Sequence, residues 1–222
     1  MAADLLAERV LPSAADSHAA RLAAAGSGCH PWVEDLGAVP VIVEPRDLAD
    51  AVHLLSSLHG RPPGLVELAV AGSPLSAHGW LSTAAEGWER ERLYLLRLTA
   101  AVGPLPSTHG NAETEAAILA QRHALETLAR SERCGCALGA AAALVSDWRS
   151  IRPLLDRAAL RAGTDVPPSE LPDERSIETV LTSAATAVAT ERAIRFGAEQ
   201  ILLQHRALWD LLEARSEARE GF

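Results

Sequence analysis

The stretch CGCALGAAAALV, residues 134–145, decides the fold. On a helix it places apolar side chains on one face and small residues on the other. The apolar face continues through Trp148 to Ala159, and the small residues are Gly135, Gly139, Ala142 and Ser146. Small residues allow another backbone to approach closely. The stretch is therefore predicted to be the central helix of a bundle, buried on both sides.

The two cysteines of this stretch also suggest a metal site. Residues two apart on a helix point about 200° from each other, so Cys134 and Cys136 reach one metal only if the helix breaks at Gly135. In that case Cys29 and His30 would complete a four-ligand zinc site. The sequence has no Cys-x-x-Cys spacing, and close packing is the preferred interpretation.

The neighbouring segments also have helical composition. One helix is expected at 111–133, with Asn111 as its N-cap, and a second at 136–163, where Pro153 kinks or divides it. A loop over 163–173 follows.

One very long helix, bent at Gly197, is predicted over 174–220. The segments 111–162 and 174–220 have similar lengths and flank a short connection, so they are predicted to form an antiparallel hairpin.

The N-terminal half is divided into shorter elements. Helices are expected at 14–25, 45–60, 64–71 and about 83–103, and an extended segment is possible at 38–45. Together the pattern predicts an all-α, up-down helical bundle in a single domain, 1–222. Residues 1–105 would supply shorter helices and loops that pack on the long hairpin of residues 106–222.

Composition excludes several classes of protein. The net charge is −9, all 20 basic residues are arginine, and these are interleaved with carboxylates, which argues against nucleic-acid binding. No apolar run approaches the ~20 residues of a membrane span. The N-terminus lacks the basic region of a signal peptide, so the protein is expected to be cytoplasmic, with reduced cysteines. Abundant alanine and arginine indicate a GC-rich bacterial source.

Three ionisable residues, Glu132, Glu191 and His205, lie on otherwise apolar helix faces, and together with Arg195 they form the candidate buried polar site. His205 belongs to the inner face of the last helix, and Glu132 to that of the helix at 111–133. If the hairpin turns near residue 168, Glu132 and His205 are level and are predicted to contact each other. The preferred interpretation is a structural pair that sets helix register, and the alternative is a ligand or metal site.

Glu191 lies on the same face as His205, roughly 21 Å away along the helix, so the two cannot bind one metal ion. Arg195 follows Glu191 by four residues and is expected to neutralise it. His123 and Glu126 point away from the apolar face and are expected to be solvated.

No phosphate-binding loop, nucleophile elbow or His-Glu-x-x-His motif is present, so no cofactor and no catalytic residue are predicted. The five tryptophans are expected to be core or interface anchors.

In outline, long antiparallel helices that carry carboxylates inward resemble the ferritin-like bundles. That resemblance covers at most residues 83–220, and the Glu-x-x-His motif of the family is missing. The preferred functional hypothesis is a non-enzymatic cytoplasmic protein that self-associates, as a homodimer or larger homo-oligomer, and binds a partner or a small ligand. The alternative is a ferritin-like metal-dependent or oxidative enzyme that uses Glu132, Glu191 and His205.

Overall fold

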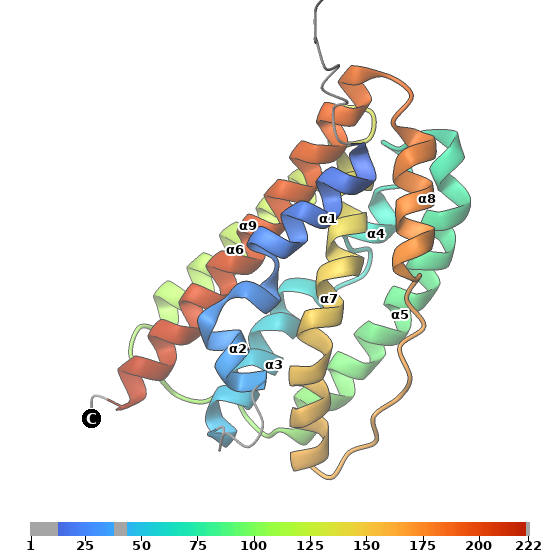
Figure 1. Cartoon of the computed structure of the whole chain (residues 1–222). Helices are drawn as coiled ribbons and strands as arrows, with labels where there is room; N and C mark the ends of the chain where they lie inside the picture. Colours follow the sequence, from blue (N-terminus) through green and yellow to red (C-terminus); the bar gives the residue numbers. More distant parts are fainter. Residues whose placement is uncertain (1–12, 38–43, 221–222) are drawn as a thin grey trace, which may run out of the picture.

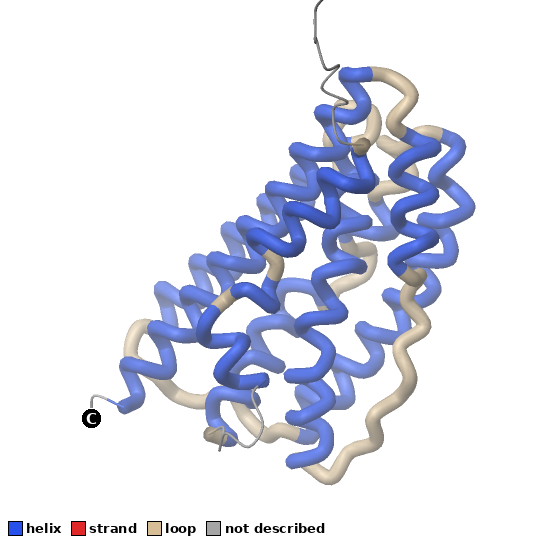
Figure 2. The backbone as a smooth tube through the Cα atoms, viewed as in Figure 1, coloured by secondary structure: helices blue, strands red, loops and turns tan. Residues whose placement is uncertain are grey.

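The computed structural model describes residues 13–37 and 44–220. Throughout these ranges the chain is helical or irregular and no strand occurs, which confirms the predicted all-α class (Figures 1 and 2). The possible extended segment at 38–45 lies mostly outside the described residues, and its last residue, Pro45, begins a helix.

The described ranges contain nine α-helices and two short 3-10 helices, Ser27–Cys29 and Leu75–Ala77. The α-helices are α1 (Ala14–Ala25), α2 (Pro31–Gly37), α3 (Pro45–His59), α4 (Leu65–Leu68), α5 (His78–Ala101), α6 (Asn111–Ala129), α7 (Cys136–Arg161), α8 (Glu174–Ala184) and α9 (Val188–Glu220).

Local signals account for the N-terminal helices. Ser13 caps α1 in a capping box with Asp16, Pro45 occupies the first turn of α3, and α3 ends at Gly60. The predicted helices at 14–25 and 45–60 are confirmed. Helix α5 begins at His78, earlier than predicted, directly after a 3-10 turn.

Helix α7 is the centre of the bundle, as predicted (Figure 1). Every residue from Cys136 to Trp148 is buried. The small-residue stripe meets α9: a Cβ added at Gly139 would lie 2.0 Å from the carbonyl oxygen of Ile194, and one added at Gly197 would lie 1.9 Å from that of Cys136. Only glycine fits at either position, so the two backbones touch.

The predicted antiparallel hairpin of 111–162 with 174–220 is wrong. The chain reverses at residues 130–135, so α6 and α7 are separate helices. After α7, residues 162–173 run back along the molecule to α8, and a second turn at 185–187 leads into α9 (Figure 1).

Helix α9 consequently runs parallel to α7. Gly197 lies against Cys136, and further along both helices His205 bonds to Asp147. It is α6 that runs antiparallel to α9, with Thr114 near Arg215. The intervening loop and α8 reverse the direction that a single hairpin would have given.

Other local expectations are also corrected. Gly110, with φ of +79°, precedes α6 as its N-cap, and Asn111 instead accepts a hydrogen bond from Arg215. Pro153 lies inside α7 and Gly197 inside α9 without ending either helix.

The core is rich in alanine, leucine and tryptophan. Trp88, Trp148 and Trp209 are among the largest fully buried side chains, which confirms their expected role as core anchors. In the described part of the chain, none of the helices is both long enough and apolar enough to cross a membrane.

Candidate functional site

His205 is buried as predicted, but the structure gives it different partners. Its Nδ1 atom lies 2.5 Å from Oδ2 of Asp147, and its Nε2 atom lies 3.0 Å from Nε2 of His59. Glu132 is exposed in the turn between α6 and α7. The predicted Glu132–His205 contact is therefore wrong, because the parallel packing of α7 and α9 brings Asp147 level with His205.

Glu191 and Arg195 form the expected ion pair, 3.2 Å apart and only partly buried, in the first turns of α9. Both imidazole nitrogens of His205 are already engaged. Glu132, Glu191 and His205 therefore do not form a common site.

Asp147 is the centre of a buried polar chain. One carboxylate oxygen, Oδ1, accepts a hydrogen bond of 2.6 Å from the backbone N–H of Ser27. The other, Oδ2, faces the Ser27 hydroxyl and His205, each at 2.5 Å. Trp209 donates to Ser27 Oγ at 2.8 Å, which orients that hydroxyl towards the carboxylate. Three donors therefore hold this carboxylate in a core that excludes water.

His59, the last residue of α3, extends this chain of hydrogen bonds beyond His205. Its ring is enclosed by Trp88 and Trp148, with ring centroids 5.9 and 5.8 Å away, both edge to face. Trp148 is held in turn by Glu91, which accepts its indole N–H at 2.9 Å. The imidazole of His59 is therefore fixed by rigid aromatic neighbours.

The environment sets the charges of this Asp147–His205–His59 chain. Burial lowers the pKa of His59 well below its usual value, and the neighbouring His205 lowers it further. Burial alone would raise the pKa of Asp147, but interactions with His205 and Ser27 outweigh burial and leave this pKa below its usual value. At neutral pH, Asp147 is a carboxylate and His59 is uncharged.

The His59 end of the Asp147–His205–His59 chain opens into a pocket. His59 lines a cavity of about 200 Å³ between the end of α3, the 60–64 loop, α4, α5 and α6. Since one water needs roughly 10–15 Å³ of such space, the cavity suits a compact ligand. Its apolar wall includes Leu65, Trp88, Leu125 and Leu144.

The same pocket is positively charged. Arg61, Arg122 and Arg130 line it together with a single carboxylate, that of Glu126. These arginines make no ion pair with another residue of the described ranges. A local excess of positive charge in a chain of net charge −9 is typical of a site for a small anion.

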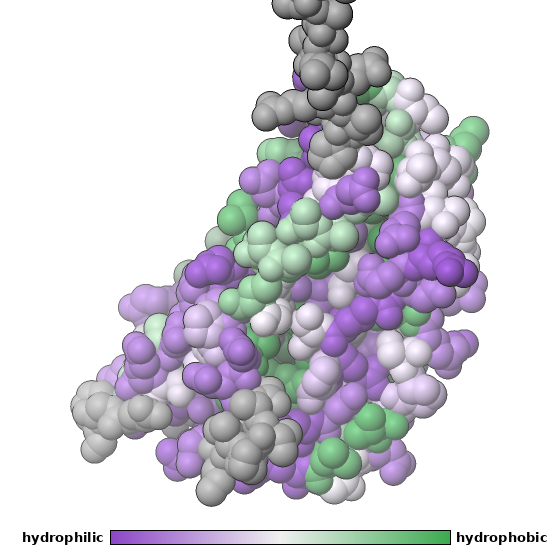
Figure 3. Space-filling model, in the orientation of Figure 1, coloured by the Kyte–Doolittle hydropathy of each residue, from purple (hydrophilic) through white to green (hydrophobic). Residues whose placement is uncertain are grey.

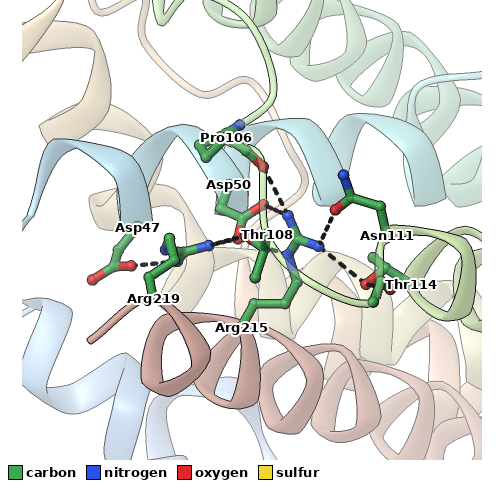
Figure 4. A network of polar contacts seen from close by, with 9 residues as sticks. Asp47, Asp50, Pro106, Thr108, Asn111, Thr114, Arg215 and Arg219 are labelled. Carbon is green, nitrogen blue, oxygen red and sulfur yellow. Dashed lines mark hydrogen bonds and ion pairs between the residues drawn. The ribbon is translucent and has the colours of Figure 1, made fainter. Parts of the chain in front are cut away.

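A second buried polar network lies further along α9 (Figure 4). Arg215 binds both oxygens of Asp50, at 2.8 and 2.9 Å, and its other donors reach Thr114, Asn111 and the carbonyl of Pro106. Arg219 joins Asp50 and Asp47, each at 2.6 Å. We call Asp47, Asp50, Arg215 and Arg219 the arginine clamp.

The clamp is electrically neutral, and the guanidinium group of Arg215 is saturated. All five N–H donors of the Arg215 guanidinium have acceptors, and two carboxylates match two guanidinium groups. No donor of Arg215 is left to bind a ligand, so the clamp is a structural link between α9, α3 and the start of α6.

Potential metal ligands gather elsewhere. Among the described residues, His30, Asp210 and Glu213 are the group of three whose ligand atoms lie within 4.8 Å of one another. A hydrogen bond of 3.0 Å between His30 and Asp210 already accounts for this approach. Cys134 is exposed while Cys136 is buried in α7, so the zinc site considered for these cysteines is not assembled.

Sequence reasoning missed both Asp147 and His59. Asp147 had a usable signal, because it is the first charged side chain after the stretch 134–145, whose helix is predicted to be buried on both sides. His59 had none, since it sits at a helix end next to Gly60 and became buried only through the packing of Trp88 and Trp148. The exposure of His123 and Glu126 agrees with prediction.

Fold and site define the class of this protein: an all-α bundle with a buried Asp–His–His chain that ends at a small, arginine-lined pocket. The chain belongs to a family described as "Family of unknown function (DUF6975)", whose model matches residues 22–220. Comparison with curated proteins and with solved structures found no significant match. None of these comparisons supports a ferritin-like family, and the long antiparallel hairpin on which that resemblance rested is not formed.

Proposed function

We propose that this protein binds a small anionic molecule in the pocket beside His59. The observation that carries the proposal is the meeting of three arginines without a carboxylate partner and the buried end of the Asp147–His205–His59 chain. Arginine guanidinium groups favour carboxylate and phosphate oxygens, which they bind through paired hydrogen bonds. The apolar wall would exclude water from the rest of the ligand.

Binding is measured by titration calorimetry with inorganic phosphate, sulfate, acetate and succinate at low ionic strength. Arg122→Gln is expected to weaken binding by at least about tenfold, since one charge-assisted hydrogen bond contributes roughly 1.5–3 kcal/mol. Arg97→Gln is the matched control, because Arg97 is an exposed arginine of α5 outside the pocket.

The proposal fails if none of these anions binds, or if Arg122→Gln and Arg97→Gln weaken binding equally. Equal effects would show that anions respond to overall charge and not to this pocket.

Self-association and a cytoplasmic location remain predictions. Figure 3 shows a hydrophobic patch over α1, where Ala19, Ala20, Ala23, Ala24 and Ala25 are exposed. This flat alanine face offers a second copy of the chain a surface for close helix packing. Size-exclusion chromatography with light scattering measures the mass, and Ala20→Arg is expected to reduce any dimer while leaving a purely monomeric protein unchanged.

A further inference from the structure

The proton positions in the Asp147–His205–His59 chain follow from its geometry. Because Asp147 is ionised, Nδ1 of His205 carries a proton, and this N–H donates a hydrogen bond to Oδ2 of Asp147. One proton then lies between the two Nε2 atoms, 3.0 Å apart. If His205 is neutral, its Nε2 is an acceptor, so His59 must donate from Nε2. Nδ1 of His59 is then an unprotonated lone pair.

The part of the chain that the structure describes leaves that lone pair without a hydrogen-bond partner. Among the described residues, the buried side-chain atoms without a hydrogen-bond partner are Nδ1 of His18, Nδ1 of His30 and Oε1 of Gln121. Nδ1 of His59 has no hydrogen-bond partner in the described ranges either, yet it is not one of these buried atoms. This nitrogen is therefore not fully buried. Since His59 lines the pocket, this nitrogen is accessible to a ligand there.

We propose that Asp147, His205 and His59 form a proton relay in which His59 acts as a general base towards an acidic group of the bound anion. This inference rests on the proposed anion-binding function and adds a chemical step to it. The ligand class is a small carboxylate or phosphate ester that also carries a weakly acidic proton.

The step is balanced without oxidant or cofactor. The X–H bond of the ligand breaks, its electron pair stays on X, and the proton bonds to Nδ1 of His59. The Nε2–H bond of His59 breaks at the same time, and that proton bonds to Nε2 of His205. The products are a ligand with one more negative charge, a neutral His59 and an imidazolium at His205.

The relay moves the positive charge to where the protein can hold it. His59 lies between two tryptophans, and burial there opposes a charge on its own ring. His205 instead faces the Asp147 carboxylate at 2.5 Å, so an imidazolium at this position forms an ion pair. The added negative charge on the ligand would face the pocket arginines.

The charged groups around His59 come from several elements. Helix α9 contributes His205, α7 contributes Asp147, and α6 contributes Arg122, Glu126 and Arg130. Arg61 approaches from the loop that follows α3.

A ligand-free experiment tests the relay first. Histidine is labelled with ¹⁵N, and long-range ¹H–¹⁵N correlation spectra are recorded from pH 8 downwards. At pH 8 we expect His59 to carry its proton on Nε2. As the pair takes up one proton, we expect His205 to become doubly protonated and His59 to change to the Nδ1–H tautomer. Nδ1–H on His59 already at pH 8 would overturn the proposal, because no base would then face the pocket.

Two variants move this transition in opposite directions. Asp147→Asn removes the carboxylate that stabilises the imidazolium, so protonation of the pair should shift to lower pH. Ser27→Ala removes a donor from Asp147 and leaves it a stronger acceptor for His205, so protonation should shift to higher pH. His18→Gln is the control, because His18 is buried but bonds to Ser146 outside the relay. Shifts of the same sign in both relay variants would contradict the relay.

Calorimetry with sulfate, which brings no proton, separates the relay from anion binding. In buffers of different ionisation enthalpy, wild-type protein should take up about one proton per sulfate bound, and Asp147→Asn should take up clearly less. Sulfate binding without proton uptake would overturn the relay and leave the proposed function intact. Absence of sulfate binding would count against the proposed function, while the tautomers of His59 still decide the relay.

Discussion

Helix α9 carries two buried polar networks that differ in their use of charge. In the arginine clamp, permanently charged guanidinium groups meet an equal number of carboxylates and every donor of Arg215 is satisfied. In the Asp147–His205–His59 chain, a carboxylate is linked through two imidazoles to a pocket. A network of permanently charged, paired groups holds helices together, whereas imidazoles can also gain or lose a proton. The clamp therefore has a structural role, whereas the Asp147–His205–His59 chain is the part that we propose to move a proton.

The largest effect is expected from Gly197→Ala, which would separate α9 from α7. The Asp147–His205 contact joins these two helices and should therefore be disturbed more than the clamp. The new methyl group would overlap the carbonyl of Cys136. Overpacking of this kind should cost about 5 kcal/mol of unfolding free energy or prevent folding. Urea denaturation measures the change. Gly79→Ala is the control, because that added Cβ has no neighbour within 4 Å, and it should stabilise α5 by up to about 1 kcal/mol.

Breaking the clamp from one side should have the next largest effect. Arg215→Met leaves Asp50, which is fully buried, with Arg219 as its remaining cation. The expected loss is about 4 kcal/mol, as for other buried ion pairs that lose one partner. The double variant Asp50→Leu with Arg215→Met should recover much of this loss in urea denaturation. Strictly additive effects would mean that Asp50 and Arg215 are not coupled.

Acid should destabilise the fold through its buried histidines. Burial, with a smaller effect of Arg21, lowers the pKa of His18 to about 4 in the folded state, against about 6.5 when unfolded. The unfolded chain therefore binds more protons between these values, so stability is full above pH 6.5 and falls as the pH drops towards 4. His18 alone would account for up to about 3 kcal/mol, and the lowered pKa of His59 acts in the same direction.

Urea denaturation between pH 7.5 and 4.5 measures this loss. His18→Gln should flatten the pH dependence, because it removes the group whose pKa burial lowers. An equal slope in wild type and His18→Gln would show that His18 does not stay neutral in the fold.

The smallest effect is expected from the exposed pair on the same helix. Arg195→Ala removes the partly exposed ion pair with Glu191 and should cost below about 0.5 kcal/mol in low-salt urea denaturation, and less in high salt. Glu191→Gln should give the same result. A loss comparable to that of Arg215→Met would remove the distinction between buried and surface charge on α9.

Sequence patterns alone predicted the all-α class, the central position of the 134–145 stretch and the starts of α1 and α3. These depend on interactions within a few residues: the capping box of Ser13, the favoured place of Pro45, and a helix apolar on one face and small on the other. The i,i+4 pair of Glu191 and Arg195 is local for the same reason. The burial of His205 also followed from helical periodicity.

Only the tertiary structure decided which buried side chains meet. The turns at 130–135 and 185–187 set the direction of α9 relative to α7, and that direction gave His205 the partner Asp147 instead of Glu132. His59 and Ser27 reach the same network from far earlier in the chain, so helical periodicity contains no information on their approach. Local patterns determine which face of a helix is buried, because that depends on residues one turn apart. The contacts across that face depend on the path of loops and on backbone packing at Gly139 and Gly197, which only the whole fold determines.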